Sequence, residues 1–254
     1  MDSVVRVVTL AACAYVVQAA EPGMVLIPAG EFLRGRSHPW SDYDEVKWYP
    51  NAARDEEPAR RISLDAFYID ETEVTNERYA AFVQATGHRP PYYWREGKLP
   101  EGKEKYPVVN VTWDDAKEFC AWAGKRLPTE AEWERAARGP AEGKMYPWGD
   151  RDPTNKDARY NKLDGPGPVC ASAKNEFGLC DMIGNVWEWC SDWYGQHYYK
   201  VAPDRNPPGP EKGLYRVLRG GSWFDIPKLF LTSSYRSWAR QGERSPTIGL
   251  RCAK

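Results

Sequence analysis

The chain has 254 residues, with 35 lysines and arginines against 36 aspartates and glutamates, which gives a formal net charge of -1 at pH 7. This balance excludes the general electrostatic attraction by which basic proteins bind nucleic acids or anionic membranes. The length suits a single domain, while 21 glycines and 21 prolines predict much loop and 13% aromatic residues argue against a disordered chain.

The N-terminal segment, residues 1–20, is predicted to be a signal peptide. An uncharged and mostly apolar stretch runs from Val7 to Val17 behind Arg6. It is too short to span a bilayer, but its length is that of a signal-peptide core. Small residues follow, and we expect cleavage near Ala19 or Ala20. The mature protein should therefore be extracytoplasmic, in a periplasm, a secretory lumen or the medium.

Two alternatives stay open for this leader. Cys13 could be lipidated, because the residues before it resemble the lipobox of bacterial lipoproteins. The leader could also be a short strand or helix of a cytosolic protein. No transmembrane segment is expected in either case, and residues 21–254 should form one domain.

The mature chain should begin with a β-hairpin. Residues 24–35 read as two short strands around a turn at Pro28 to Gly30. A polar loop is expected over residues 36–60. Alternating apolar and polar residues then predict a strand over residues 62–68.

Three helices are predicted, each by a threonine that can cap its first turn and a glycine that can end it. Asp115 and Glu132 lie three residues after two of these threonines, where their carboxylates can complete capping boxes. Beyond residue 140 no helical period of useful length occurs, so short strands and long loops are expected. The capping threonines are Thr75, Thr112 and Thr129, and the terminating glycines are Gly87, Gly124 and Gly139.

Eight short motifs follow one another in the mature chain. They are MVLIPAGEF (24–32), EVTN (73–76), YPVVNVTW (106–113), AGKRLPTEAEWE (123–134), YPWG (146–149), FGL with GNVWEW (177–179 and 184–189), RGGSW (219–223) and GLRC (249–252). In this order they resemble the formylglycine-generating enzyme family, also called the sulfatase-modifying factor family. The resemblance implies an irregular α/β domain with a C-type-lectin-like fold. We expect two to three helices, short antiparallel strands and much loop.

The resemblance makes the GNVWEW motif a calcium loop. Calcium takes about six to eight oxygen ligands, which a carboxylate, an amide and backbone carbonyls can supply in part. We expect Glu188 as the charged ligand, with Asn185 and the carbonyls of Gly184 and Val186 beside it. The alternative is that Glu188 pairs with an arginine and no metal binds. A second family calcium site would begin near Asn161, where no aspartate follows that clearly completes it.

The family's enzymes, as the resemblance implies, hold Cu(I) with two thiolates that follow the RGGSW motif. Asp225 and Phe230 stand at those two positions here. A carboxylate and a phenyl ring cannot bind Cu(I) as thiolates do, so copper is not expected and formylglycine formation is not supported. Ser222 matches the family's active-site serine, and it either lines a residual pocket or holds a turn after two glycines.

Arginines and aromatic residues gather near the C-terminal end. They either rim a pocket for an anionic or aromatic ligand, with Ser222, Trp223 and Arg236 as candidate residues, or form structural ion pairs. The arginines are Arg219, Arg236, Arg240, Arg244 and Arg251.

Five of the six cysteines follow the leader, so at most two internal disulfides can form. The resemblance pairs Cys120 with Cys252, because the matching cysteines are joined in secreted family members. Cys170 and Cys180 flank a predicted turn and form the second expected pair, which leaves Cys190 as a free, buried thiol. If the protein is not exported, all five stay reduced.

Three function classes follow. The first is an exported family member without the copper thiolates that performs another oxidative maturation of a secreted protein or metabolite, similar to the family's pyoverdine-maturation members. The second is a non-catalytic module that binds a small molecule or a secreted protein on a lectin-like scaffold. The third and least favoured is an active copper-dependent, sulfatase-modifying oxidase. The sequence identifies no substrate or partner, and we expect a monomer.

Overall fold

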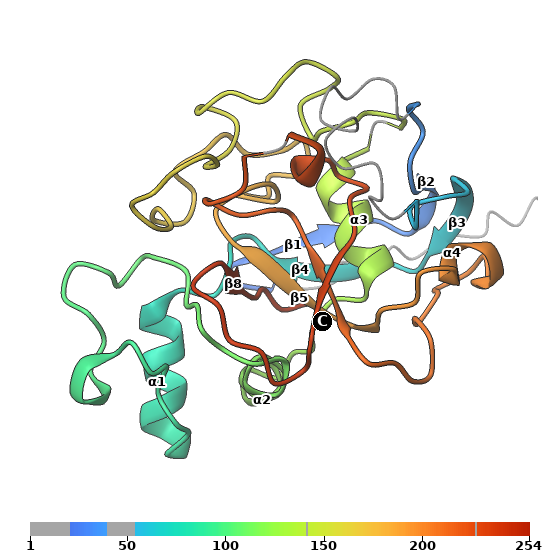
Figure 1. Ribbon diagram of the computed structural model, residues 1–254. Coiled ribbons are helices and arrows are strands. Elements are labelled where there is room, and N and C mark those ends of the chain that lie inside the picture. The colour runs from blue at the N-terminus through green and yellow to red at the C-terminus, as the bar shows by residue number, and fades with distance from the viewer. Residues whose placement is uncertain (1–20, 40–53, 141, 227) are drawn as a thin grey trace, which may run out of the picture.

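Figure 1 shows the chain as a computed structural model, which describes residues 21–39, 54–140, 142–226 and 228–254. The predicted signal peptide lies outside these residues. The architecture is an irregular α/β fold in which three helices of 9 to 11 residues, one helix of 4 residues and short strands are joined by long loops. No helix within the described residues is long and apolar enough to cross a membrane.

The N-terminal strands pair with later strands and not with each other. The predicted hairpin over residues 24–35 is therefore wrong. Because Pro28 has no N–H to donate to a ladder, the chain bends at this residue and does not reverse. Residues 24–34 instead form a kinked antiparallel ribbon with residues 60–70. The pairs are β1 (Met24–Ile27) with β4 (Phe67–Asp70) and β2 (Gly30–Arg34) with β3 (Arg60–Leu64).

The three predicted helices are present and begin at the predicted caps. The Oγ of Thr112 accepts the Asp115 N–H at 3.1 Å, and Asp115 accepts the Thr112 N–H at 2.9 Å. Thr129 and Glu132 form the same reciprocal box. The first helix ends at Gly87, whose φ of 72° is left-handed and favours glycine. The helices are α1 (Asn76–Thr86), α2 (Trp113–Trp122) and α3 (Glu130–Arg138).

The C-terminal half contains a four-stranded sheet with the strand order β7-β6-β5-β8. Its pairs are antiparallel except for the parallel pair of β5 and β8. Two 3-10 turns cover Arg95–Gly97 and Lys228–Leu231. The elements are β5 (Trp187–Trp193), α4 (Tyr198–Val201), β6 (Arg216–Arg219), β7 (Ser237–Ala239) and β8 (Ile248–Gly249).

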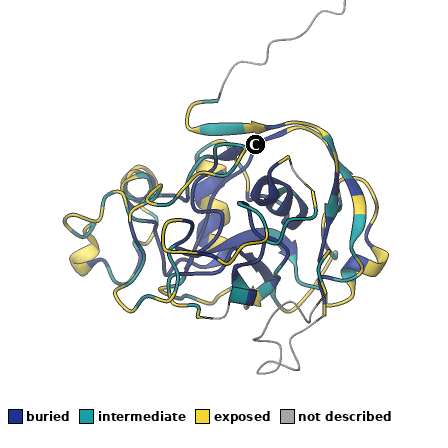
Figure 2. Cartoon of the chain, turned by 90° about the horizontal axis from the view of Figure 1, so that it is seen from above, coloured by how far each residue is buried: buried dark blue, intermediate teal, exposed yellow. Residues whose placement is uncertain are grey.

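Two apolar clusters form the core. One contains Trp133 of α3 together with Phe32 and Ile62 of the kinked ribbon. The other joins α1, α2 and β5 through residues such as Phe119 and Trp189. Figure 1 shows α3 near the centre and α1 and α2 at the lower left, and Figure 2 shows buried segments surrounded by exposed loops.

Two glutamates of α3 hold buried arginines, one of them from the same helix and two from the C-terminal half of the chain. Glu134 accepts hydrogen bonds from Arg219 at 2.8 Å and Arg138 at 2.9 Å, and Glu130 accepts two from Arg236 at 2.6 and 2.9 Å. None of these five side chains is more than 4% exposed. Burial by itself would raise the pKa of Glu130, but Arg236 and Arg219 lower it below its usual value. The ionised pairs therefore connect α3 to the C-terminal half.

Both predicted disulfides are present. Cys120 is bonded to Cys252, which joins α2 to the C-terminal segment, and Cys170 is bonded to Cys180. Cys190 is free and buried, as predicted. Burial raises the pKa of its thiol well above the usual value, so little reactive thiolate forms at neutral pH.

Asp192 makes the stability of the fold depend on pH. Its Oδ2 accepts the N–H of Glu130 at 2.9 Å, and burial followed by the charge of Glu130 raises its pKa from 3.8 to about 7. Folded protein therefore keeps a proton that the unfolded chain loses above about pH 4. This contribution to the free energy of unfolding is full below that pH and falls by about 1.4 kcal/mol per pH unit up to about pH 7.

The substitution Asp192→Asn should flatten this decline, because an amide does not titrate. Chemical denaturation measured between about pH 5 and pH 7 should show a smaller loss of stability in the variant than in the natural protein. Asp114→Asn, at an exposed aspartate of α2, should leave the decline unchanged. Equal declines in the natural protein and in Asp192→Asn would contradict the assignment.

Candidate functional site

The predicted calcium loop turns sharply into β5. Gly184 and Asn185 have positive φ values of 78° and 58°. A Cβ atom at Gly184 would lie 2.6 Å from the carbonyl oxygen of Arg159, so this close approach requires glycine. The side chain of Asn185 is used within the protein. Its Oδ1 accepts the Gly167 N–H at 2.9 Å, and its Nδ2 donates to Glu73 at 3.1 Å.

Glu188 is fully buried and is held by donors on both oxygens. Oε2 accepts from Nε1 of Trp133 and from Nε of Arg251, each at 2.7 Å, and Oε1 accepts from Nη2 of Arg251 at 2.7 Å. This is the alternative arrangement, in which Glu188 pairs with an arginine. Arg251 already supplies the positive charge that a metal would bring, so this donor set does not fit calcium. Calcium binding stays a prediction from the resemblance.

Two further buried acids lie near this ion pair. Burial, and then the charges of Asp181 and Glu188, raises the pKa of Glu73 well above its usual value. Burial also raises the pKa of Asp181, although the N–H that it accepts from Cys170 opposes the shift. Both shifts have the same main cause, the desolvation of carboxylates that lie close to one another.

Asn161, the start of the second predicted calcium site, lies at the surface. Its N–H donates to the carbonyl oxygen of Asp225 at 3.0 Å, and the Lys162 N–H donates to that of Trp223 at 2.7 Å. The segment is thus bonded alongside the turn that follows the RGGSW motif. Calcium at Asn161 stays a prediction.

Structural side chains fill the family's copper positions. Oδ2 of Asp225 accepts from the N–H and Oγ of Ser222 at 2.8 and 2.6 Å, and the Phe230 ring packs on Tyr235 with centroids 4.9 Å apart. Ser222 is 1% exposed and holds this turn. A carboxylate and a phenyl ring lack the soft sulfur donors that Cu(I) prefers, so these residues do not fit copper.

Three of the C-terminal arginines are buried and form structural ion pairs. Arg219 and Arg236 bind the glutamates of α3, and Arg251 binds Glu188. Arg236 therefore does not join Ser222 and Trp223 in a pocket. Of these three candidate residues, only Trp223 lines an open site.

Trp223 lines a groove of about 500 Å³, which we call the aromatic groove. Hydrogen bonds orient two of its rings. The Tyr93 hydroxyl donates to Oδ1 of Asn76 at 2.7 Å, and Nε1 of Trp223 donates to the carbonyl oxygen of Pro246 at 3.1 Å. Prolines and aromatic rings form most of the lining. Its main residues are Tyr92, Tyr93, Tyr106, Pro107, Trp223 and Pro246.

Asn110 is the polar residue of the groove whose hydrogen bonding is incomplete. Its side chain is buried, with 4% of the residue exposed, and its Oδ1 has no hydrogen-bond partner within the described residues. Its backbone N–H donates to the carbonyl oxygen of Ser245 at 3.0 Å, and its φ of 59° is left-handed. A buried acceptor without a donor costs about 1 to 3 kcal/mol. Because Asn110 also lines the groove, its Oδ1 is the candidate acceptor for a ligand bound there.

Asn110 and Tyr92 are not among the site residues that the sequence predicts. Asn110 lies within the YPVVNVTW motif, but a sequence does not show that an asparagine is both buried and unpartnered. Tyr92 belongs to a run of aromatic residues that carries no spacing signal. Both residues acquire their place in the site only through loops that meet in the folded protein.

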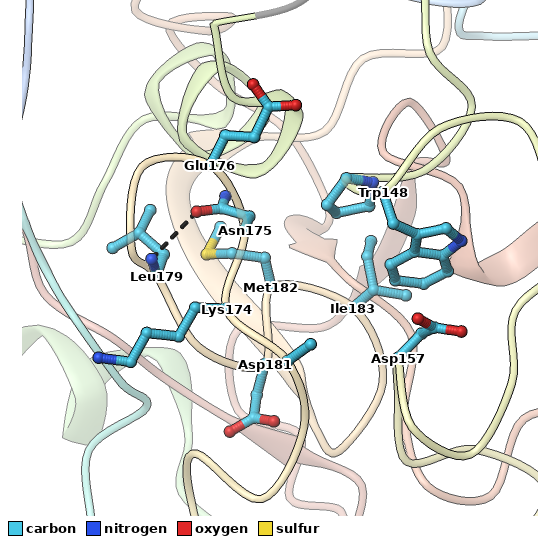
Figure 3. Close-up of a pocket in the computed structure, with 11 residues that line it drawn as sticks. Trp148, Asp157, Lys174, Asn175, Glu176, Leu179, Asp181, Met182 and Ile183 are labelled. Atoms are coloured by element: carbon cyan, nitrogen blue, oxygen red, sulfur yellow. Dashed lines mark hydrogen bonds between the residues drawn. The ribbon is translucent and has the colours of Figure 1, made fainter.

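A second, smaller hollow of about 120 Å³ is lined largely by residues 173–183 (Figure 3). Asn175 orders its loop by accepting the Leu179 N–H at 3.0 Å. Asp157 is paired with an arginine and Lys174 with a glutamate. No buried lining group here lacks a partner in the described chain. The aromatic groove is therefore the stronger candidate site.

Comparisons with known proteins agree with the resemblance carried by the eight motifs. A family model for the sulfatase-modifying factor enzyme 1-like domain matches residues 12–254. The formylglycine-generating enzyme of Streptomyces coelicolor is 37% identical over 91% of this chain and 88% of its own length. Among solved structures, PvdO from Pseudomonas aeruginosa is similar with a TM-score of 0.74 and 29% identity, covering 92% of this chain and 99% of PvdO.

One curated relative is much longer than this chain. The serine/threonine-protein kinase pkn1 of Chlamydia caviae is 38% identical over 91% of this chain. The chain spans 38% of the length of that relative. The similarity therefore concerns one part of the kinase-named protein and carries no statement about the rest of it.

One substitution distinguishes two roles of Glu188, the ion pair with Arg251 and the binding of calcium. Glu188→Gln should lower the free energy of unfolding by about 3 kcal/mol, because it removes the charge of the carboxylate that accepts two hydrogen bonds from the buried Arg251 guanidinium. If the pair replaces a metal, the melting temperature of the natural protein should be the same in calcium and in chelator. The surface variant Glu142→Gln, whose side chain pairs with Arg61, should melt like the natural protein.

Calorimetry of the three proteins with calcium and with chelator provides the measurement. A higher melting temperature in calcium for the natural protein, lost in Glu188→Gln, would restore the calcium loop. Equal stability of Glu188→Gln and the natural protein would contradict the structural role of the pair.

Proposed function

The chain belongs to the sulfatase-modifying factor enzyme family, and from this premise we propose that it is an exported, non-catalytic member that binds a ligand in the aromatic groove. The ligand is a small molecule or a segment of a secreted protein. The protein is expected to act as a monomer. This is the second of the function classes considered from the sequence.

The observation that carries this proposal is the unpartnered oxygen of Asn110 within an aromatic groove. Aromatic rings offer large contact areas, and ligand sites combine such surfaces with a few placed polar groups. A ligand N–H or O–H that reaches Oδ1 of Asn110 would satisfy it. The rings of Tyr92 and Trp223 would cover the apolar part of the ligand.

A copper oxidase is the least supported function. Asp225 and Phe230 occupy the two family positions, where one carboxylate caps a turn and one ring packs on a tyrosine. Cys190 is the free cysteine of the described residues, and it is buried. A single buried thiol cannot replace the two thiolates that hold Cu(I).

Oxidative maturation of a metabolite or protein is the second candidate. It is favoured by the similarity to PvdO, which extends over 99% of that chain. The same ligand would then enter the aromatic groove and leave chemically changed. Oxygen-dependent change in the mass of a bound ligand would favour this candidate over simple binding.

Export is supported by the two disulfides, which are typical of proteins in oxidising compartments. The apolar stretch from Val7 to Val17 is the leader that we propose directs this export.

The groove can be tested with N-phenylnaphthylamine, an aromatic amine whose fluorescence rises in apolar surroundings. We expect binding by the natural protein and about tenfold weaker binding by Trp223→Ala, because the ring is lost. Asn110→Gly, which tolerates the left-handed backbone, should weaken binding several-fold by removing the acceptor for the amine N–H.

The matched control is Trp122→Ala, which removes a tryptophan that is 44% exposed on α2 outside the groove. It should bind the probe like the natural protein. Fluorescence titrations of folded variants provide the comparison. Absence of binding by the natural protein, or equal loss in the control, would contradict a ligand site at the groove.

Export predicts a defined N-terminus. Protein recovered from outside the cytoplasm should begin near Ala20 or Glu21, because small residues precede this point. N-terminal sequencing and intact mass provide the measurement. An intact Met1 on cytoplasmic protein, or a lipid on Cys13, would refute this processing.

A further inference from the structure

Another hollow, of about 400 Å³, shares Tyr92 with the aromatic groove and is lined by two arginines. We infer that this hollow binds an anionic group of the ligand that occupies the groove. The inference rests on the proposed binding function and adds the charge of the ligand to it. The hollow is lined by Arg89, Pro90, Pro91, Tyr92, Trp94 and Arg244.

Two features place this hollow beside the groove. Tyr92 lines both and is 71% exposed, so one ligand can contact it from either side. Arg244 of the hollow and Pro246 of the groove belong to the same loop. The residue between them, Ser245, accepts the backbone N–H of Asn110 at 3.0 Å. The loop thus holds Arg244 in a defined place relative to the groove floor.

The two guanidinium groups lie around one carboxylate. Nη2 of Arg244 is 2.9 Å from Oδ2 of Asp115, and Nη2 of Arg89 is 3.9 Å from Oδ1 of the same residue. Arg89 is therefore held only loosely, and its side chain is 68% exposed. Both groups thus lie within 3.9 Å of the same carboxylate and line the same hollow.

Asp115 has other strong partners and does not cancel both arginines. It accepts the N–H of Thr112 at 2.9 Å and lies 3.0 Å from Nε2 of His88. Burial opposes ionisation, but the bonds from Thr112 and the charge of Arg244 lower its pKa below the usual value. Glu118 is the other acid here, and it lies 3.2 Å from Nδ1 of His88. Among the described residues, the acid that pairs with Arg89 is Asp115, at 3.9 Å.

The groove contributes no competing acid to this hollow. Its one carboxylate, Asp164, is bonded to Arg159 at 2.6 Å. Guanidinium groups recognise carboxylates, sulfates and phosphates through paired hydrogen bonds, and they also stack on aromatic rings such as Tyr92. The ligand class is therefore an aromatic or apolar molecule with a hydrogen-bond donor for Asn110 and an anionic group beyond Tyr92.

A pair of probes that differ by one charged group tests this inference. Anilinonaphthalene sulfonate has the ring system of N-phenylnaphthylamine plus a sulfonate. The natural protein should bind the sulfonate about tenfold more tightly than the neutral amine, and added salt should reduce this difference. The double variant Arg89→Gln/Arg244→Gln should lose the difference while its affinity for the neutral amine is unchanged.

Arg89→Gln alone is the second variant, because the exposed Arg89 side chain can be replaced without removing the bond between Arg244 and Asp115. It should lose several-fold in affinity for the sulfonate only. Arg205→Gln is the matched control, since this arginine is 72% exposed and pairs with Asp65 away from the groove. The control should bind both probes like the natural protein.

The outcomes separate the two proposals. If neither probe binds, the ligand site itself is wrong. If both probes bind equally, or if the arginine variants keep the preference for the sulfonate, the groove stands and the anionic subsite is wrong.

A competition experiment then identifies the anion. N-acetyltyrosine carries a carboxylate and tyrosine O-sulfate a sulfate ester, and the compound that displaces the sulfonate probe more effectively indicates which anion the subsite prefers. Displacement by neither compound would also overturn the subsite.

Discussion

The fold depends on carboxylates that are buried with arginines around α3. Glu130 and Glu134 bind Arg236 and Arg219, and Trp133 donates from the same helix to Glu188, which binds Arg251. A buried charge without its partner is costly, so each pair specifies which loop must lie against the helix. A domain with so little regular sheet needs such constraints, because its strands supply few ladder hydrogen bonds.

Ion pairs and hydrogen bonds also occupy the residues that the resemblance assigns to metal binding and catalysis. The carboxylate that the resemblance assigns to calcium is neutralised by Arg251, and the acids beside it have raised pKa values. The serine that the resemblance assigns to chemistry holds a turn through Asp225. Glu188 and Ser222 therefore make structural contacts in this chain.

The aromatic groove illustrates how irregular loops can build a site. Segments far apart in the chain supply its rings, and the backbone N–H of Asn110 ties two of them together through Ser245. Because the helices and ion pairs hold the bases of these loops, their side chains can form a defined surface. The unpartnered Oδ1 of Asn110 and the arginines beyond Tyr92 add a hydrogen-bond acceptor and positive charge to that surface.

Local signals in the sequence determined the helices of this protein. Thr112 with Asp115 and Thr129 with Glu132 form the predicted capping boxes, because a cap needs only residues three apart. Motif order also identified the family and the Cys120–Cys252 pair, while the predicted turn between Cys170 and Cys180 identified the second pair. Tertiary structure alone decided that β1 pairs with β4, that Glu188 meets Arg251 63 residues later, and that Asn110 is buried without a donor. These are contacts between distant segments, and their free energies depend on burial and on partners that no local spacing reveals.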